Sequence, residues 1–430
     1  MDPVYPPTPF SLSPADANAL ELLADHLVAE TLWTHDEFVA QGRIVDLSPW
    51  RMVKQKNNLT AYRARKHTPS RFRRERVPSD ETEADTKLES ETDPSVTLLK
   101  DDSDDEFEDE FSHVDTMEEN ISENARPEHA PMVFCTGVVP GTVEGAAFGF
   151  LADTEARSRT RNSGNRDVVA DDVRILARIH GPTQGDPFRF LGVKWCFHST
   201  PGAARRFLHP RDYVVLESTG LALDSDGERF CYTLNHTIEL DEVPDYRKFS
   251  NVRIKFSACH IMKSHESPGK IEICSRDFID AGGLLAERLT TYIFCDALMI
   301  APQTVEEAYT RKLLWLYRSR RRADSSPPGL ESLRISDTCS CCHGKLHTGL
   351  AKLLEGATNS MCQLCRHTVC RKCAVKKALP LDIGGPKQLT MQTLDFCLGC
   401  YLQAKGLSAW RVAIATMSTS ATESKSCDRI

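Results

Sequence analysis

Apolar residues recur with two different periods along this chain. Between residues 14 and 41 they return every three or four positions, which predicts a helix, and Ser13 before Pro14 is typical of a helix start. Residues 43–65 lack that stripe and are expected to be extended, with Ile44, Trp50, Val53 and Tyr62 as inward anchors. The apolar stripe of the predicted helix consists of Leu20, Leu23, Leu27, Val28 and Leu32.

From residue 132 onward, short strand patterns dominate until a long helical pattern ends the region. Residues 132–139 predict a strand, and residues 143–151 predict a short helix. After Gly282 and Gly283 the period becomes helical again, over 284–300 and 305–322. Consecutive strands with short links favour an antiparallel sheet, so we expect an α+β fold in which a curved sheet closes over one long terminal helix and leaves an apolar tunnel. The intervening strand candidates are 173–180, 188–197, 212–218, 229–240, 252–262 and 270–274.

Residues 67–130 depart from this globular composition. A basic run from Arg71 to Arg76 precedes an acidic tract that is densest over residues 101–110. With few apolar side chains to bury, this segment is expected to be a disordered insert. The whole chain carries a formal net charge of −8, so we expect no nucleic-acid partner.

Eight of the sixteen cysteines form four Cys-x-x-Cys pairs near the C-terminus. Two thiolates at this spacing can bind one metal ion, and eight suffice for two closed four-sulfur zinc sites. Disulfides are the alternative, but the chain starts without an apolar export segment, so we expect a reducing, cytoplasmic compartment. The predicted ligands of two Zn²⁺ ions are Cys339, Cys342, Cys362, Cys365, Cys370, Cys373, Cys397 and Cys400.

The central spacing, Cys362-x2-Cys365-x4-Cys370-x2-Cys373, resembles the core of FYVE-type zinc fingers, and the flanking pairs fall where that family has them. The resemblance implies a cross-braced, treble-clef-like finger on endosomal membranes. By the same resemblance, the first and third pairs would bind one zinc ion, and the second and fourth pairs the other.

The basic motifs with which FYVE fingers bind phosphatidylinositol 3-phosphate are absent. Residues 333–337, 357–361 and 394–397 carry other side chains at those places. Charge-assisted bonds to phosphate are the strong ones, so the phosphoinositide pocket is not carried over to this chain.

A RING finger is the alternative for the same segment. Cys365-x-His367-x2-Cys370-x2-Cys373 fits RING spacing, with His367 as a ligand and Cys362 unused. This hypothesis predicts a ubiquitin ligase whose N-terminal domain recruits the substrate. The two hypotheses differ in whether Cys362 or His367 binds zinc.

Three stretches of the strand region, residues 190–195, 210–217 and 226–229, resemble START-like (StAR-related lipid transfer, helix-grip) domains, and most closely those that oomycete proteins join to a FYVE-type finger. The resemblance implies a cavity for a sterol, phospholipid or similar apolar molecule under the last helix. Arg211 and Asp212 would either orient a polar head group there or form a structural ion pair. The side chains expected to line the cavity are Trp195, Phe197, Tyr213, Tyr232, Phe256 and Leu285.

No Gly-x-Ser-x-Gly elbow and no phosphate-binding glycine loop occur in the sequence, so we expect no enzyme. We expect a lipid-binding, membrane-associated adaptor with a finger for docking on a membrane or a protein. It would lie in the cytoplasm, peripherally on endosomal membranes. The expected divisions are a START-like domain over 11–322 that includes the insert 67–130, a linker 323–336, a finger 337–405 and a flexible tail 406–430.

Overall fold

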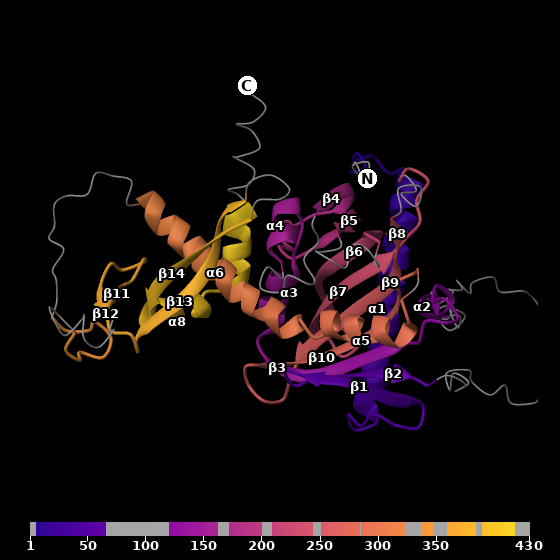
Figure 1. Cartoon of the computed structure of the whole chain (residues 1–430), viewed down its shortest axis with the longest axis horizontal. Coiled ribbons are helices and arrows are strands. Elements are labelled where there is room, and N and C mark those ends of the chain that lie inside the picture. Colours follow the sequence, from indigo (N-terminus) through magenta and orange to yellow (C-terminus); the bar gives the residue numbers. More distant parts are fainter. Residues whose placement is uncertain are drawn as a thin grey trace, which may run out of the picture.

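The computed structural model describes residues 6–65, 120–161, 172–199, 209–243, 251–283, 285–323, 337–346, 359–383 and 389–417. They form a large lobe built on one long sheet and a small C-terminal lobe, which helix α6 joins (Figure 1). We call the large lobe the sheet lobe and residues 337–406 the finger. The predicted insert up to residue 119 and most of the predicted linker lie outside the described residues.

The sheet lobe is built on antiparallel strands in the order β1-β2-β3-β10-β9-β7-β6-β5-β4, and the short β8 pairs in parallel with β6. The predicted α+β fold, a long antiparallel sheet with a long C-terminal helix and a small cysteine-rich region, is confirmed. The strands are β1 (Trp50–Lys56), β2 (Leu59–Ala64), β3 (Val133–Pro140), β4 (Asp172–His180), β5 (Phe190–His198), β6 (Arg211–Leu223), β7 (Arg229–Thr237), β8 (Val252–Arg253), β9 (Lys255–Ser264) and β10 (Lys270–Asp280).

Helix α1 (Pro14–Ala40) covers one side of the sheet, which we call the outer face. The hydroxyl of Ser13 accepts a hydrogen bond from the backbone N–H of Asp16 at 3.1 Å, so the predicted helix start is confirmed. The apolar stripe of α1 packs on strands β5, β6, β7 and β9, and Leu27 and Ile261 are both buried there.

Helices α3 (Val143–Phe150), α5 (Glu287–Leu298) and α6 (Ala301–Ala323) cover the opposite side, which we call the inner face. Their buried apolar side chains form one core with residues of β2, β3, β7, β9 and β10. Helix α3 approaches α6 closely at Gly149, where a Cβ would lie 2.1 Å from the carbonyl oxygen of Thr304. Only a residue without a side chain fits this contact. Helix α4 (Glu155–Thr160) follows α3.

Residues 120–130 were predicted to belong to the disordered insert, but they pack against the sheet lobe. The short helix α2 (Ile121–Asn124) begins where the carboxylate of Glu30 accepts from the backbone N–H groups of Ile121 and Ser122. Glu30 also pairs with Arg276 at 3.1 Å. Composition does not predict this boundary, because a partly buried carboxylate that is distant in sequence, that of Glu30, fixes the segment.

The described residues of the finger include two hairpins and the helix α8. Its core includes cysteines together with Leu379 and Phe396. The second half of α6 completes that core, because Leu313 and Tyr317 are buried in it. One helix therefore belongs to both lobes. The elements of the finger are β11 (Ser360–Met361) with β12 (Thr368–Val369), β13 (Ala374–Ile383) with β14 (Leu389–Cys397), and α8 (Leu398–Gly406).

Residues 409–417 form a further helix that returns to the sheet lobe. Ala409, Val412 and Ala413 are buried in the inner-face core, and the ring of Trp410 packs edge-on against Phe188 at 5.4 Å. The sequence predicts a flexible tail from residue 406. The structure differs up to residue 417, because these apolar side chains complete the core.

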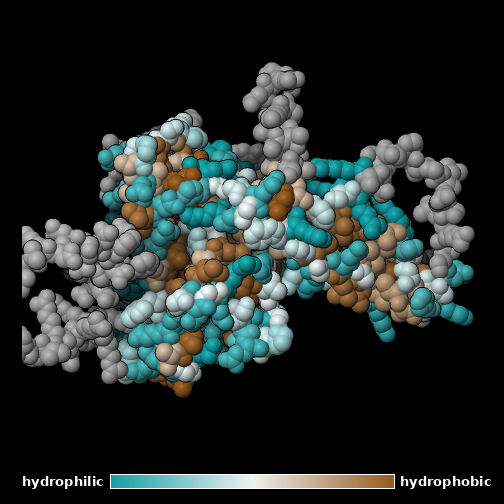
Figure 2. Space-filling model, turned by 180° about the vertical axis from the view of Figure 1, so that it is seen from behind, coloured by the Kyte–Doolittle hydropathy of each residue, from teal (hydrophilic) through white to brown (hydrophobic). Residues whose placement is uncertain are grey.

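Figure 2 shows the back of the molecule, where hydrophobic residues gather in patches, in a hollow of the sheet lobe and on the finger. Exposed apolar side chains on helices include Leu289, Tyr292 and Ile293 of α5 and Leu398 and Leu402 of α8. Among the described helices, none combines the length and the apolar character needed to cross a bilayer.

Candidate metal centres and the covered face of the sheet

Eight cysteine side chains of the finger converge in two groups of four, and in each group the sulfur atoms lie within 4.8 Å of one another. One group combines the first and third Cys-x-x-Cys pairs, and the other combines the second and fourth. This is the interleaved arrangement that the FYVE-type resemblance implies. The groups are Cys339, Cys342, Cys370 and Cys373, and Cys362, Cys365, Cys397 and Cys400.

The spacing of the sulfur atoms fits zinc. The Sγ atoms of Cys342 and Cys370 lie 3.8 Å apart, and those of Cys365 and Cys397 also lie 3.8 Å apart. A tetrahedral site with Zn–S bonds of about 2.3 Å has sulfur–sulfur edges of about 3.8 Å. Four thiolates leave no open position on the metal, so each group suits a structural zinc ion.

Two equivalent turns present the first cysteine pair of each group. The N–H of His343 donates to the carbonyl of Cys339 at 2.8 Å, and the N–H of Arg366 donates to that of Cys362 at 2.9 Å. His343 and Arg366 adopt positive φ angles of 56° and 62°. This left-handed conformation is uncommon outside glycine, and here it closes each turn tightly enough to direct two thiols at one point.

Backbone N–H groups also point at the sulfur atoms. The N–H of Cys370 lies 3.3 Å from Sγ of Cys339, and that of Leu364 lies 3.4 Å from Sγ of Cys362. Burial opposes ionisation of Cys339, but the N–H groups of Cys342 and Cys370 outweigh it and lower the pKa of this thiol to about 6. The thiolate, which is the form that binds metal, is thereby favoured.

The structure distinguishes between Cys362 and His367. Cys362 belongs to a four-sulfur group, and the side chain of His367 belongs to neither group. The carbonyl of His367 accepts from the N–H of Cys362 at 2.9 Å, so this residue closes the turn with its backbone. The RING hypothesis requires the reverse assignment, and the geometry therefore favours the FYVE-type ligand set.

Two buried charged side chains, Glu217 and Lys194, and the mostly buried Arg161 meet at one end of the inner face of the sheet. Glu217 pairs with Arg161 at 2.8 Å and with Lys194 at 2.9 Å, and Lys194 also donates to the carbonyl of Ala152 at 2.6 Å. Burial opposes ionisation of Glu217, but the two cations outweigh it and hold its pKa below the usual 4.5. Sequence reasoning missed this cluster, although Lys194 and Glu217 each interrupt an apolar strand, which was the available signal.

The predicted cavity residues divide between the two faces of the sheet. Tyr213 and Phe256 lie on the inner face, with ring centroids 5.1 Å apart, and Phe256 lies 6.3 Å from Phe294 of α5. Leu285 is half-buried just before α5. The others pack on the outer face with α1 and its neighbours, so they do not line a common space with Tyr213; these are Trp195, Phe197 and Tyr232.

Arg211 and Asp212 do not act as a pair. Asp212 is buried, pairs with Arg253 at 2.7 Å and accepts from Nε1 of Trp195 at 2.9 Å. Arg211 is half-buried and donates to the carbonyl of His209 at 3.1 Å. The ion pair predicted between Arg211 and Asp212 is therefore not formed, and Asp212 pairs with Arg253 instead.

A hollow of about 190 Å³ lies at the end of β7, with Ala125, His236 and Phe278 among its lining residues. Burial lowers the pKa of His236 to about 4, so its imidazole is neutral at pH 7. The hollow is on the side of the outer face. The predicted apolar tunnel was expected elsewhere, under the terminal helix.

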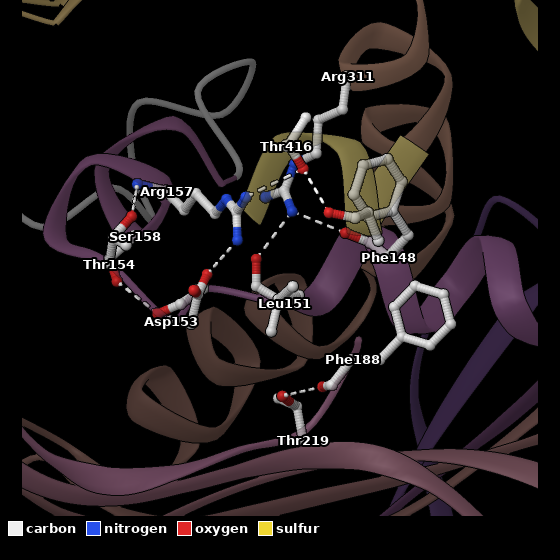
Figure 3. A network of polar contacts seen from close by, with 12 residues as sticks. Phe148, Leu151, Asp153, Thr154, Arg157, Ser158, Phe188, Thr219, Arg311 and Thr416 are labelled. Carbon is white, nitrogen blue, oxygen red and sulfur yellow. Dashed lines mark hydrogen bonds and ion pairs between the residues drawn. The ribbon is translucent and has the colours of Figure 1, made fainter. Parts of the chain in front are cut away.

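A polar network fixes the junction of α3, α6 and residues 409–417 (Figure 3). Arg311 of α6 donates to the carbonyl groups of Phe148 at 2.6 Å and Leu151 at 2.7 Å, at the end of α3. Arg157 donates to the hydroxyl of Thr416 at 3.2 Å. Burial lowers the pKa of Arg311 to about 10, which still leaves it charged at pH 7, so a cation satisfies the last carbonyl groups of a helix.

No family model and no curated protein matches this chain. Among solved structures, the crystal structure of human STARD10 matches with 11% identity and a TM-score of 0.32, over 63% of this chain and 75% of that one. Human StAR-related lipid transfer protein 5 matches with 16% identity and a TM-score of 0.32, over 65% and 95%. A STAR-related lipid transfer protein fragment from Xanthomonas axonopodis matches with 10% identity and a TM-score of 0.31, over 61% and 96%.

Proposed function

We propose that this chain is a non-enzymatic, lipid-binding adaptor. The sheet lobe holds an apolar ligand between the inner face and helices α5 and α6, as the START-like sequence resemblance implies. The finger, stabilised by two zinc ions, docks on a membrane surface or a protein partner. The protein then acts in the cytoplasm, in peripheral contact with endosomal membranes.

Helix α5 carries this proposal because it is apolar on both sides. Phe294 and Leu298 are buried in the inner-face core. Leu289, Tyr292 and Ile293 are 49%, 47% and 54% exposed. A helix that merely covered a core would present polar side chains to water on its other side. Exposed apolar patches mark contacts with other apolar material, so α5 suits a cover that touches a membrane while a ligand passes beneath it.

The attachment of α5 is compatible with movement. The chain enters it after Gly282, whose φ is +61°. At the rim, Arg63 pairs with Glu287 at 2.9 Å, and Lys54 pairs with Asp296. Partly exposed ion pairs contribute about 0–1 kcal/mol each, so breaking them costs little free energy.

Helix α6 holds the finger in a fixed place beside this cover. Glu306 pairs with Lys377 of the finger at 2.7 Å and accepts from the hydroxyl of Tyr401 at 3.1 Å. The ammonium group of Lys405 lies 4.2 Å from the ring centroid of Tyr309. Docking of the finger would therefore also orient α5.

Native mass spectrometry of the full chain after mild extraction tests the proposal. We expect two zinc ions and one co-purifying lipid, with the lipid lost on organic extraction and the zinc retained. Two zinc ions without lipid, from membranes rich in lipid, contradict ligand binding. If ubiquitin chains also form with a conjugating enzyme, the ligase hypothesis replaces this one.

A further inference from the structure

The strand register places polar residues side by side across the inner face of the sheet. In one row, Asp277 pairs with Ala258, Ala258 with Asn235, and Asn235 with Glu217. A second row of paired residues crosses the same four strands next to the first. Directly opposed residues of antiparallel strands share a face, so both rows face α3 and α5. We call their polar members the polar belt: Asp277, Asn235, Glu217, Ser275, His260, Thr233 and Thr219.

Apolar rows border the polar belt on both sides. On one side, Ile273 pairs with Met262, and Met262 pairs with Cys231; all three are fully buried. On the other side, Ile279 pairs with Phe256. A sheet face covered by helices is normally apolar throughout, so the fold itself does not require this belt.

The end of the polar belt at β6 is satisfied by the protein itself. Glu217 pairs with Arg161 and Lys194. The hydroxyl of Thr219 donates to the carbonyl of Phe188 at 3.2 Å. These residues need nothing further, and they account for why charge is tolerated at this end of the inner face.

The other end, at β7 and β10, is not satisfied. Ser275 donates to one carboxyl oxygen of Asp277 at 2.6 Å, but the second, Oδ1, has no hydrogen-bond partner among the described residues. The hydroxyl of Thr233 likewise has none there. Asp277 is 0% exposed and Thr233 is 1% exposed. Native proteins rarely leave such groups unpaired, because each one carries an uncompensated desolvation cost.

Helix α5 packs on β10, the strand of Asp277, and helix α3 packs on β7, the strand of Thr233. Burial raises the pKa of Cys295 in α5, so this side chain is an un-ionised thiol. A thiol is a poor substitute for a hydroxyl group. Asn235, in the middle of the sheet, is still partly exposed, so this part of the inner face is accessible from outside.

We propose that the unsatisfied end of the polar belt binds the uncharged hydroxyl or carbonyl group of a lipid alcohol or ester, whose hydrocarbon lies along the bordering apolar rows. This inference rests on the proposed function, because it assumes that a ligand enters beneath α5. It adds the chemistry of the head group that the site accepts.

The charge state of Asp277 supports an uncharged head group. Burial raises its pKa well above the usual 3.8, and the hydrogen bond from Ser275 offsets only part of that effect. A neutral carboxyl group can donate a hydrogen bond to a hydroxyl or carbonyl oxygen. A carboxylate head would need a cation, and the cations at the β6 end, Arg161 and Lys194, already pair with Glu217.

The two unsatisfied groups contact different atoms of the ligand. Asp277 and Thr233 lie two strands apart, and a strand spacing of about 4.8 Å separates them by roughly 10 Å. Each therefore makes its own hydrogen bond to the ligand, directly or through water, and each can be removed separately.

Displacement of a bound environment-sensitive apolar dye from the full chain tests the inference. The competitors are a long-chain alcohol and the carboxylic acid and amine of the same chain length. We expect the alcohol to compete best. Thr233→Val removes the hydroxyl group and keeps the shape of the side chain. It should weaken the affinity for the alcohol about five- to tenfold and leave the affinities for the acid and the amine unchanged. Thr219→Val is the matched control and should leave all three unchanged.

Thermal unfolding of the ligand-free variants gives a second measurement. Thr233→Val should leave the melting temperature unchanged or raise it, because it removes a buried hydroxyl group that has no partner. Thr219→Val should lower it, because it leaves the carbonyl of Phe188 unpaired. A drop for Thr233→Val alone would show that its hydroxyl group is structural and would overturn the inference.

The displacement results also separate the two proposals. If the dye binds but the three competitors are equal in wild type, or Thr233→Val affects all three alike, the polar belt does not select the head group and this inference fails while lipid binding stands. If neither dye nor competitor binds at any concentration, both fail.

Discussion

At the scale of single residues, the inner face of the sheet holds two buried carboxyl groups in opposite situations. Glu217 has two cations within 2.9 Å, and its pKa is lowered. Asp277 has hydrogen-bond donors but no cation, and its pKa is raised. The first carboxyl group contributes to folding stability in its charged form, whereas burial favours the neutral form of the second. Their contrast separates structural charge from a candidate binding group.

Glu217→Gln should be strongly destabilising. The amide keeps the shape of the side chain but leaves Lys194 and Arg161 buried without a counter-charge, which costs about 3–5 kcal/mol. Urea unfolding measures this loss. Glu144→Gln is the control, because Glu144 forms a surface ion pair with Arg229 at 3.1 Å. Its loss should lower the free energy of unfolding by less than about 1 kcal/mol. Equal effects of the two substitutions would contradict a structural role for the cluster.

The folding stability of wild type and that of Glu217→Gln should depend differently on pH. The folded-state pKa of Glu217 lies below 4.5, so its contribution to stability is complete above pH 4.5 and is lost as the pH falls through the lowered value. Glu217→Gln should remove that part of the acid sensitivity. An unchanged slope below pH 4.5 would indicate that other carboxyl groups cause it.

At the scale of elements, local patterns predicted the helices and strands well, but the faces of the strands could not be predicted from them. Trp195 of β5 pairs with Val214 of β6, so these two side chains share a face of the sheet. Tyr213 precedes Val214 in β6 and therefore points to the opposite face. Which face lies under α5 depends on how the terminal helices fold back over the sheet, and no short segment encodes that choice. The aromatic residues expected to line one cavity were therefore divided between two cores.

The cysteine site was more predictable than the inner face for the same physical reason. A Cys-x-x-Cys turn brings two ligands together within four residues, so spacing alone identifies candidate ligands. The combination of pairs is not local: Cys339 joins Cys370 across residues outside the described ranges. It came from the FYVE-type resemblance, and the structure groups the sulfur atoms in that way.

The exposed side of α5 leads to a prediction about membranes. Ile293→Ser should reduce sedimentation with lipid vesicles, since it removes apolar area from the patch without touching the core. Its thermal stability should stay within about 0.5 kcal/mol of wild type. Leu223→Ser is the matched control, because Leu223 is 64% exposed and lies on the hairpin between β6 and β7.

Both outcomes of the vesicle measurement are informative. A selective loss for Ile293→Ser identifies α5 as the contacting element. Equal losses for the two variants would mean that general surface hydrophobicity drives binding. No loss for either would assign vesicle binding to the finger or to another surface.

At the scale of the whole molecule, the two lobes share structural elements. Helix α6 buries Val305 and Ala308 in the inner-face core and Leu313 and Tyr317 in the finger core. The chain then leaves the finger and returns residues 409–417 to the inner-face core. The free energy of metal binding contributes to the folding of such a finger. Its stabilising effect should therefore reach the sheet lobe through both connections.

Removing zinc should therefore loosen more than the finger. Hydrogen exchange after chelation should show lost protection in residues 359–383 and 389–406, in the second half of α6 and in residues 409–417, while β5, β6 and β7 keep theirs. Cys397→Ser should reproduce this pattern. Cys341→Ser is the control, because Cys341 lies outside both four-sulfur groups. If exchange increased in the finger alone, the shared helix would be stable without it, and the finger would be an independent module rather than part of the support beneath α5.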